Sequence, residues 1–151
     1  MPLSPDDREA LRALRGAFAD AANLRDVERF TALFADAATW DIPDMHARFE
    51  GRAAIRAGIE RMLGLWEFFV QLTHDGIVDG DGDVAWGRAY VTEIGRFRAG
   101  GSQRNHAVYD DRFVRTAVGW QFASRTYRFL YVDESPLAGR ALPVPELRNG
   151  G

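Results

Sequence analysis

The sequence predicts an α+β fold in which helices from the first half of the chain cover a sheet made by the second half. Apolar residues recur at helical spacing up to about residue 63, and long stretches of alternating residues follow. Short glycine-containing turns separate those stretches, which favours antiparallel pairing. With 151 residues the chain can bury a proper core as one domain. We expect a single domain over 1–151, with about 1–4 and 146–151 flexible.

Three helices are predicted before the long strands. The first begins after Ser4, a typical N-cap, with Pro5 at the first helical position. Asp26 is expected to cap a short second helix, and apolar residues at helical spacing over 55–63 indicate a third. A short strand over 38–43, which ends at a proline, lies between the second and third helices.

Four long strands are predicted after the third helix, over about 66–79, 83–98, 104–116 and 119–132. The turn 79–83 alternates aspartate and glycine like a calcium loop, but it lacks the downstream glutamate and joins two strands. We therefore interpret it as a plain hairpin turn. A twisted sheet of such strands, with helices on its concave side, leaves a natural pocket.

Composition excludes several kinds of chemistry. The chain has no cysteine, and all nineteen basic residues are arginines, so thiol and Schiff-base mechanisms are excluded. The net charge of −3, with acids and bases interleaved, indicates neither a nucleic-acid nor a membrane partner. Because no signal or membrane-spanning segment is apparent, we expect a cytoplasmic protein. His46, His74 and His106 are too scattered to suggest a metal site, so we predict no metal.

One histidine stands out at the end of an apolar stretch. If 66–74 is a regular strand, Trp66, Phe68, Val70, Leu72 and His74 share one face. A titratable imidazole at the end of such a face is where a buried general base would sit. The alternative is a core histidine with a satisfied hydrogen bond.

Several motifs resemble one known superfamily. They are the segments 33–40 (LFADAATW), 49–55 (FEGRAAI), 81–85 (DGDVA) and 109–115 (YDDRFVR), followed by a Gly-Trp pair. In this order and spacing they resemble the SnoaL-like branch of the nuclear transport factor 2-like superfamily, over about 5–145. The resemblance implies a cone-shaped α+β barrel with a curved, mainly antiparallel sheet.

Within that branch the chain resembles the scytalone dehydratase and hexachlorocyclohexane dehydrochlorinase subgroup. His74 lies near the end of the strand after the third helix, and the tail 135–139 with its later prolines is also similar. The resemblance implies that His74 removes a proton, with neither cofactor nor metal. The position of its orienting aspartate is held by Asn23, which can accept a hydrogen bond but supplies no negative charge. Asp20 lies one helical turn earlier.

Other polar groups are expected in the same pocket. Asp111 is predicted to face inward and to act as an acid with a raised pKa; the alternative is an ion pair with Arg88 or Arg125. Trp86, Arg88 and Tyr90 are expected inward on the neighbouring strand. The predicted substrate-binding residues, for whose aromatic members core filling is the alternative, are Trp40, Tyr90, Tyr109, Arg125, Tyr127 and Phe129.

The sequence thus favours a cofactor-independent enzyme for proton-transfer chemistry. Dehydration, isomerisation or cyclisation of a small hydrophobic oxygenated molecule, polyketide- or terpenoid-like, is the leading hypothesis, with His74, Asn23 and Asp111 as catalytic residues. The alternative is a non-catalytic module that binds small molecules or pairs with proteins on the same fold. Epoxide hydrolysis would need a second aspartate beside Asp111 and Arg125. Exposed apolar positions on the sheet's outer face predict a homodimer or homotrimer.

Overall fold

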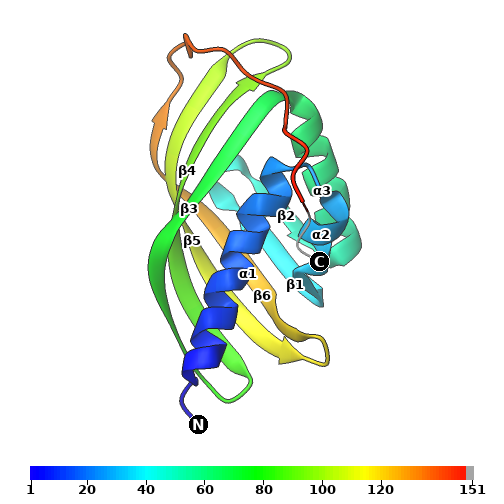
Figure 1. Cartoon of the computed structure of the whole chain (residues 1–151), viewed down its shortest axis with the longest axis vertical. Helices are drawn as coiled ribbons and strands as arrows, with labels where there is room; N and C mark the ends of the chain where they lie inside the picture. Colours follow the sequence, from blue (N-terminus) through cyan, green and yellow to red (C-terminus); the bar gives the residue numbers. More distant parts are fainter. Residues whose placement is uncertain (149–151) are drawn as a thin grey trace.

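The computed structural model describes residues 1–148 and shows three helices packed on one strongly curved sheet (Figure 1). The helices are α1 (Pro5–Asn23), α2 (Val27–Ala32) and α3 (Arg52–Leu65), with a 3-10 turn η1 (Pro43–Met45). The strands are β1 (Phe34–Ile42), β2 (Ala47–Glu50), β3 (Trp66–Asp81), β4 (Val84–Phe97), β5 (Ser102–Thr116) and β6 (Gly119–Asp133). The predicted α+β class is confirmed.

The sheet is mixed and open, with the strand order β2-β1-β6-β5-β4-β3. The four long strands form an antiparallel meander, and β1 adds to β6 in parallel. Two details differ from the sequence prediction. The first strand begins at Phe34 and not at residue 38, and a further short strand, β2, pairs with β1.

The helices begin where the sequence predicts. Ser4 caps α1 with a capping box, because its Oγ accepts from the Asp7 backbone N at 3.1 Å and Asp7 Oδ2 accepts from the Ser4 N at 3.2 Å. Asp26 caps α2 by accepting from the Arg29 backbone N. Helix α1 then crosses the concave side of the sheet (Figure 1).

Small residues on the concave face of β4 leave room for α1. Ala85, Gly87 and Ala89 follow one another on this face, and a Cβ on Gly87 would lie 2.5 Å from Arg15 Nη2. Further along the strand, a Cβ on Gly95 would lie 2.6 Å from the ring of Trp66. Gly95 is therefore needed for the inward placement of Trp66, and Gly87 leaves room for the Arg15 guanidinium and for the neighbouring backbone at Ile77, whose oxygen a Cβ would approach to 2.4 Å.

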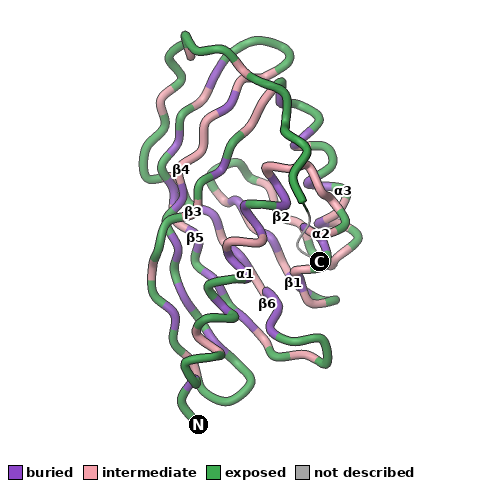
Figure 2. The backbone as a smooth tube through the Cα atoms, viewed as in Figure 1, coloured by how far each residue is buried: buried purple, intermediate pink, exposed green. Residues whose placement is uncertain are grey.

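Burial is concentrated between the helices and the concave face (Figure 2). The convex face instead exposes large apolar side chains, among them Val70, Leu72, Tyr90 and Tyr131. In the described part of the chain, no helix is both long enough and apolar enough to cross a membrane.

The two ends of the chain were predicted to be flexible. The structure describes residues 1–4 in full and the C-terminal segment as far as residue 148. Residues 1–4 contact the β3–β4 turn, where Gly82 N donates to Met1 O at 2.8 Å, and Leu3 is buried. Residues 146–148 are exposed. The remainder of the predicted C-terminal segment, 149–151, lies outside the described residues.

Candidate functional site

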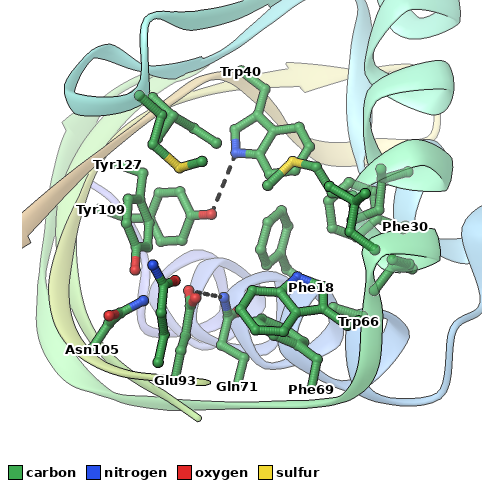
Figure 3. Close-up of a pocket in the computed structure, with 18 of the residues that line it drawn as sticks. Phe18, Phe30, Trp40, Trp66, Phe69, Gln71, Glu93, Asn105, Tyr109 and Tyr127 are labelled. Atoms are coloured by element: carbon green, nitrogen blue, oxygen red, sulfur yellow. Dashed lines mark hydrogen bonds between the residues drawn. The ribbon is translucent and has the colours of Figure 1, made fainter. Parts of the chain in front are cut away.

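A pocket opens between the three helices and the concave face of the sheet (Figure 3). Its cavity has a volume of about 130 Å³. Aromatic and aliphatic side chains make up most of its wall, which includes Phe18, Phe30, Trp40, Ile42, Met45, Ile59, Met62, Leu63, Leu65, Trp66, Phe69, Phe97, Tyr109, Tyr127 and Phe129. Besides the tyrosines, the polar residues in the described lining are Gln71, Glu93, Gln103 and Asn105. A mostly apolar cavity with a few polar groups is typical of small-molecule sites.

His74 does not line this pocket. The pairing of β3 with β4 shifts register between Trp66 and Phe68, so Trp66, Phe69 and Gln71 line the cavity while His74 is exposed. On the convex face, His74 Nε2 lies 2.8 Å from the Thr92 hydroxyl. The prediction that His74 faces a pocket is therefore wrong, because it assumed an unbroken alternation along the strand.

His106 and His46 also lie outside the pocket lining. His106 Nδ1 lies 3.2 Å from the same Thr92 hydroxyl that His74 contacts. His46 is exposed and adopts a left-handed conformation directly after η1.

Asn23 contacts Gln71 instead of a histidine. Its Oδ1 accepts from Gln71 N at 2.7 Å, and its Nδ2 donates to Gln71 O at 2.8 Å. Asn23 thus holds the β3 backbone and is not itself part of the pocket lining. Asp20 is exposed and pairs with Arg29 at 2.7 Å, so it does not reach the site.

Glu93 is the one carboxyl group among the described residues that line the pocket. It comes from β4 and accepts a hydrogen bond from Gln71 Nε2 at 2.9 Å. Burial raises the pKa of Glu93 to about 7, and the hydrogen bond from Gln71 partly opposes that rise. Both its acidic and its basic forms are therefore populated near neutral pH.

Sequence reasoning missed Glu93 because it assigned the wrong face of β4. The inward residues of that strand include Ala85, Gly87, Ala89, Val91 and Glu93. The sequence did contain a signal for it. Glu93 continues the alternation of the small apolar residues that precede it on β4, and a strand that packs against a core presents such residues inward. Trp86, Arg88 and Tyr90 lie on the convex side, and Tyr90 is 44% exposed, so their predicted inward placement is wrong.

Buried polar atoms without a partner surround Glu93. Within residues 1–148, they include Gln71 Oε1, Asn105 Oδ1 and the Tyr127 hydroxyl. Their side chains gather with Glu93 at one end of the cavity (Figure 3). Because buried polar groups are normally satisfied, a ligand or water is the natural partner.

Four of the predicted substrate-binding residues do line the pocket, namely Trp40, Tyr109, Tyr127 and Phe129. Trp40 Nε1 donates to the Tyr109 hydroxyl at 3.3 Å (Figure 3). Burial raises the pKa of Tyr109 and also that of Tyr127.

Asp111 and Arg125 form a buried ion pair beneath the pocket. Arg125 Nε donates to Asp111 Oδ1 at 2.7 Å and Nη2 to Oδ2 at 3.1 Å, while Arg15 Nε lies 3.7 Å from Oδ2. Burial raises the pKa of Asp111, and the two arginines oppose that rise. Neither residue lines the cavity, so the prediction of Asp111 as a pocket acid is wrong, as is that of Arg125 as a lining residue. The alternative of an Asp111–Arg125 pair is what the structure shows.

The described residues contain no group of three or more potential metal ligands among their histidines, aspartates and glutamates. The polar end of the pocket instead supplies one carboxylate, amide groups and a phenol. Such a set suits hydrogen bonding and proton transfer.

Solved structures share this fold across nearly their full length. A protein from Novosphingobium aromaticivorans, named provisionally as an aromatic ring hydroxylase, is 25% identical, with a TM-score of 0.82 over 88% of this chain and 96% of that one. A type 2 hexachlorocyclohexane dehydrochlorinase (LinA) is 20% identical, with a TM-score of 0.81 over 93% of this chain and 99% of its own. A second protein of N. aromaticivorans, named provisionally as a scytalone dehydratase, is 18% identical, with a TM-score of 0.76 over 89% and 94%.

The family follows from the sequence comparison. No curated protein matches the chain significantly. The profile of the SnoaL-like domain, however, matches residues 4–126, which is most of the chain. The chain therefore belongs to the SnoaL-like domain family, the branch that its motifs resemble.

Proposed function

We propose that the protein is a cofactor-independent enzyme that transfers protons on a small hydrophobic molecule, with Glu93 as the acid–base group. The observation that carries the proposal is the position of Glu93, a carboxyl group with a pKa of about 7 inside a mostly apolar pocket. A general acid or base works best when its pKa is close to the working pH. Glu93 takes the role that the sequence had suggested for His74.

The neighbouring residues have supporting roles in this proposal. Gln71 donates to Glu93 and stabilises its ionised form, and Tyr127 lies beside the same carboxyl group. Asn23 acts as a positioning residue because it fixes the Gln71 backbone. The Tyr109 hydroxyl, which accepts from Trp40, can donate its own proton to a substrate oxygen.

The pocket suits a small substrate. Its volume of about 130 Å³ is similar to that of an engineered cavity of about 150 Å³ that binds benzene. We therefore favour a substrate body of about one ring, oxygenated, as a small terpenoid-like or polyketide-derived fragment would be. Dehydration, isomerisation and cyclisation remain the reaction classes; the dehydrochlorinase and dehydratase names of two structural neighbours fit this choice.

Deuterium exchange tests the proposed acid–base role. Small cyclic ketones and β-hydroxyketones would be incubated with the protein in D₂O and followed by NMR. We expect exchange with a midpoint near pH 7 in the wild type and in His74→Ala. Glu93→Gln should lower the exchange rate by roughly 10²-fold or more, the usual contribution of a general base. Equal exchange in the wild type and Glu93→Gln would contradict the proposal.

A non-catalytic binding role is the second candidate, favoured by the unpartnered atoms of Gln71, Asn105 and Tyr127. It predicts binding of the same compounds without any exchange above the uncatalysed rate. The NMR experiment separates the two candidates, because line broadening reports binding and loss of the exchanging signal reports catalysis.

A further inference from the structure

The polar end of the pocket is rich in hydrogen-bond acceptors. Gln71 and Asn105 are 4% and 3% exposed, and each has a side-chain carbonyl oxygen without a partner among the described residues. Glu93 adds a carboxylate that accepts from Gln71 Nε2. A ligand that satisfies this end must therefore donate hydrogen bonds, and more than one.

The rest of the wall favours positive charge. Aromatic rings form much of the lining, including Trp40, Trp66 and Tyr127, and the faces of such rings attract cations. In the described lining there is no arginine or histidine that would repel a cation. Two guanidinium groups lie behind the lining: Arg125 is 3.7 Å from the Tyr109 ring centroid and is paired with Asp111, and Arg25 donates to the backbone oxygens of Leu63 and Trp66.

We propose that the pocket binds a small primary amine in its protonated form. The three N–H groups of the ammonium would donate to Glu93, Gln71 and Asn105, and the apolar body, about the size of one ring, would lie against the aromatic wall. An alcohol offers a single donor, and a carboxylate would be repelled by Glu93. The inference uses the same pocket as the proposed function but goes beyond it, because it concerns the ligand class and requires no catalysis.

Three ligands of one size test the proposal: benzylamine, benzyl alcohol and benzoate. Affinities for the full chain would be measured by calorimetry at pH 8, where Glu93 is ionised. We expect benzylamine to bind at least about tenfold more tightly than benzyl alcohol, as charge-assisted hydrogen bonds and cation–π contacts allow. Benzoate should show no binding. Equal affinities for the amine and the alcohol, or no binding by either, would overturn the proposal.

A matched pair of variants locates the preference. Glu93→Gln should bring the benzylamine affinity close to that of benzyl alcohol, while the alcohol affinity itself stays within about twofold, which shows that the pocket is intact. Glu9→Gln makes the same change at an exposed site on α1 and should alter neither affinity. A preference for the amine that survives in Glu93→Gln would place the ammonium elsewhere and overturn the proposal.

Proton linkage gives a second readout. The titratable groups that face Glu93 in the pocket are Tyr109 and Tyr127, whose pKa values are raised, so both stay neutral near pH 7. Benzylamine should release about half a proton from Glu93 on binding at pH 7, whereas benzyl alcohol should release none. Calorimetry in phosphate and in Tris, at equal pH, measures this release. Zero release with benzylamine would contradict the proposed contact. Failure of deuterium exchange alone would remove the proposed catalysis and leave this inference standing.

Discussion

The side-chain amide of Asn23 hydrogen-bonds both backbone groups of Gln71, much as a neighbouring strand would. The last residue of α1 is thereby joined to the strand that carries the Glu93 partner. Replacement by aspartate keeps the acceptor but removes the donor, and it places a carboxylate oxygen near the Gln71 carbonyl. We expect Asn23→Asp to lower the free energy of unfolding by about 1–3 kcal/mol, measured by urea denaturation.

The matched control for this variant is Asp20→Asn, which alters one charge on the exposed side of the same helix. Its effect should stay within about 1 kcal/mol, as for other exposed ion pairs. Equal stability of Asn23→Asp and the wild type would show that the contact with Gln71 contributes nothing measurable.

The raised pKa of Glu93 predicts how stability depends on pH. Its pKa is about 7 in the folded protein against 4.5 for the model carboxyl, so the folded state binds more protons between these values. Stability contributed by this group is therefore present at pH 4.5 and is lost as pH rises to 7, a change of roughly 3 kcal/mol. Glu93→Gln should lack this component, which denaturation of both proteins from pH 4.5 to 8 would reveal. Parallel stability curves would contradict the raised pKa.

The buried ion pair beneath the pocket should be costly to break. Arg125→Leu leaves Asp111 in the core with only Arg15 nearby, at 3.7 Å. A loss of about 3–5 kcal/mol in the free energy of unfolding is expected, as for other broken buried pairs. Arg48→Leu, which removes an exposed partner of Glu50, should cost no more than about 1 kcal/mol. Similar losses from the two variants would argue against a structural role for Arg125.

His74 should be dispensable for ligand binding. Because its side chain is exposed on the convex face, His74→Ala is expected to leave the benzylamine and benzyl alcohol affinities unchanged within about twofold. Gln71→Leu, which changes an inward residue of the same strand, should weaken benzylamine binding. A strong loss of affinity in His74→Ala would show that the histidine can reach the cavity after all.

The convex face is our proposed contact between copies of the chain, as a homodimer or homotrimer. Leu72 and Tyr131 are 53% and 56% exposed there, and such apolar patches mark association sites. The double variant Leu72→Arg, Tyr131→Arg should sediment as a monomer under conditions where the wild type forms oligomers. A Val118→Arg, Leu142→Arg protein has the same change in charge at exposed apolar residues elsewhere and should keep the wild-type state.

Helical spacing and capping residues were sufficient to predict the helices, because both signals are local. Ser4 and Asp26 cap α1 and α2, and the long strands lie close to their predicted ranges. The start of β1 at Phe34 was missed, because its apolar residues continue the helical pattern of α2 and only the pairing with β6 shows a strand.

The site was less predictable because it depends on which alternate residues of each strand face the concave side. The first of two register shifts between β3 and β4, which lies between Trp66 and Phe68, moves Gln71 inward and His74 outward. Nothing in the local sequence marks that shift, and on β4 the large aromatic residues drew the prediction to the wrong face. On β5 and β6 the expected parity held, which is why Tyr109 and Tyr127 were placed correctly.

The order of side-chain sizes along β4 divides the concave side of the molecule into two compartments. At Ala85, Gly87 and Ala89 the sheet lies close to α1 and Arg15, so this end of the concave side is filled by packed side chains. Beyond Val91, the strand carries Glu93 and then Phe97, and here the cavity opens. Substitutions near Glu93 and Phe97 can therefore change the shape of the pocket without disturbing the packing of β4 against α1. The same scaffold can in this way accept new ligands through changes confined to a few positions.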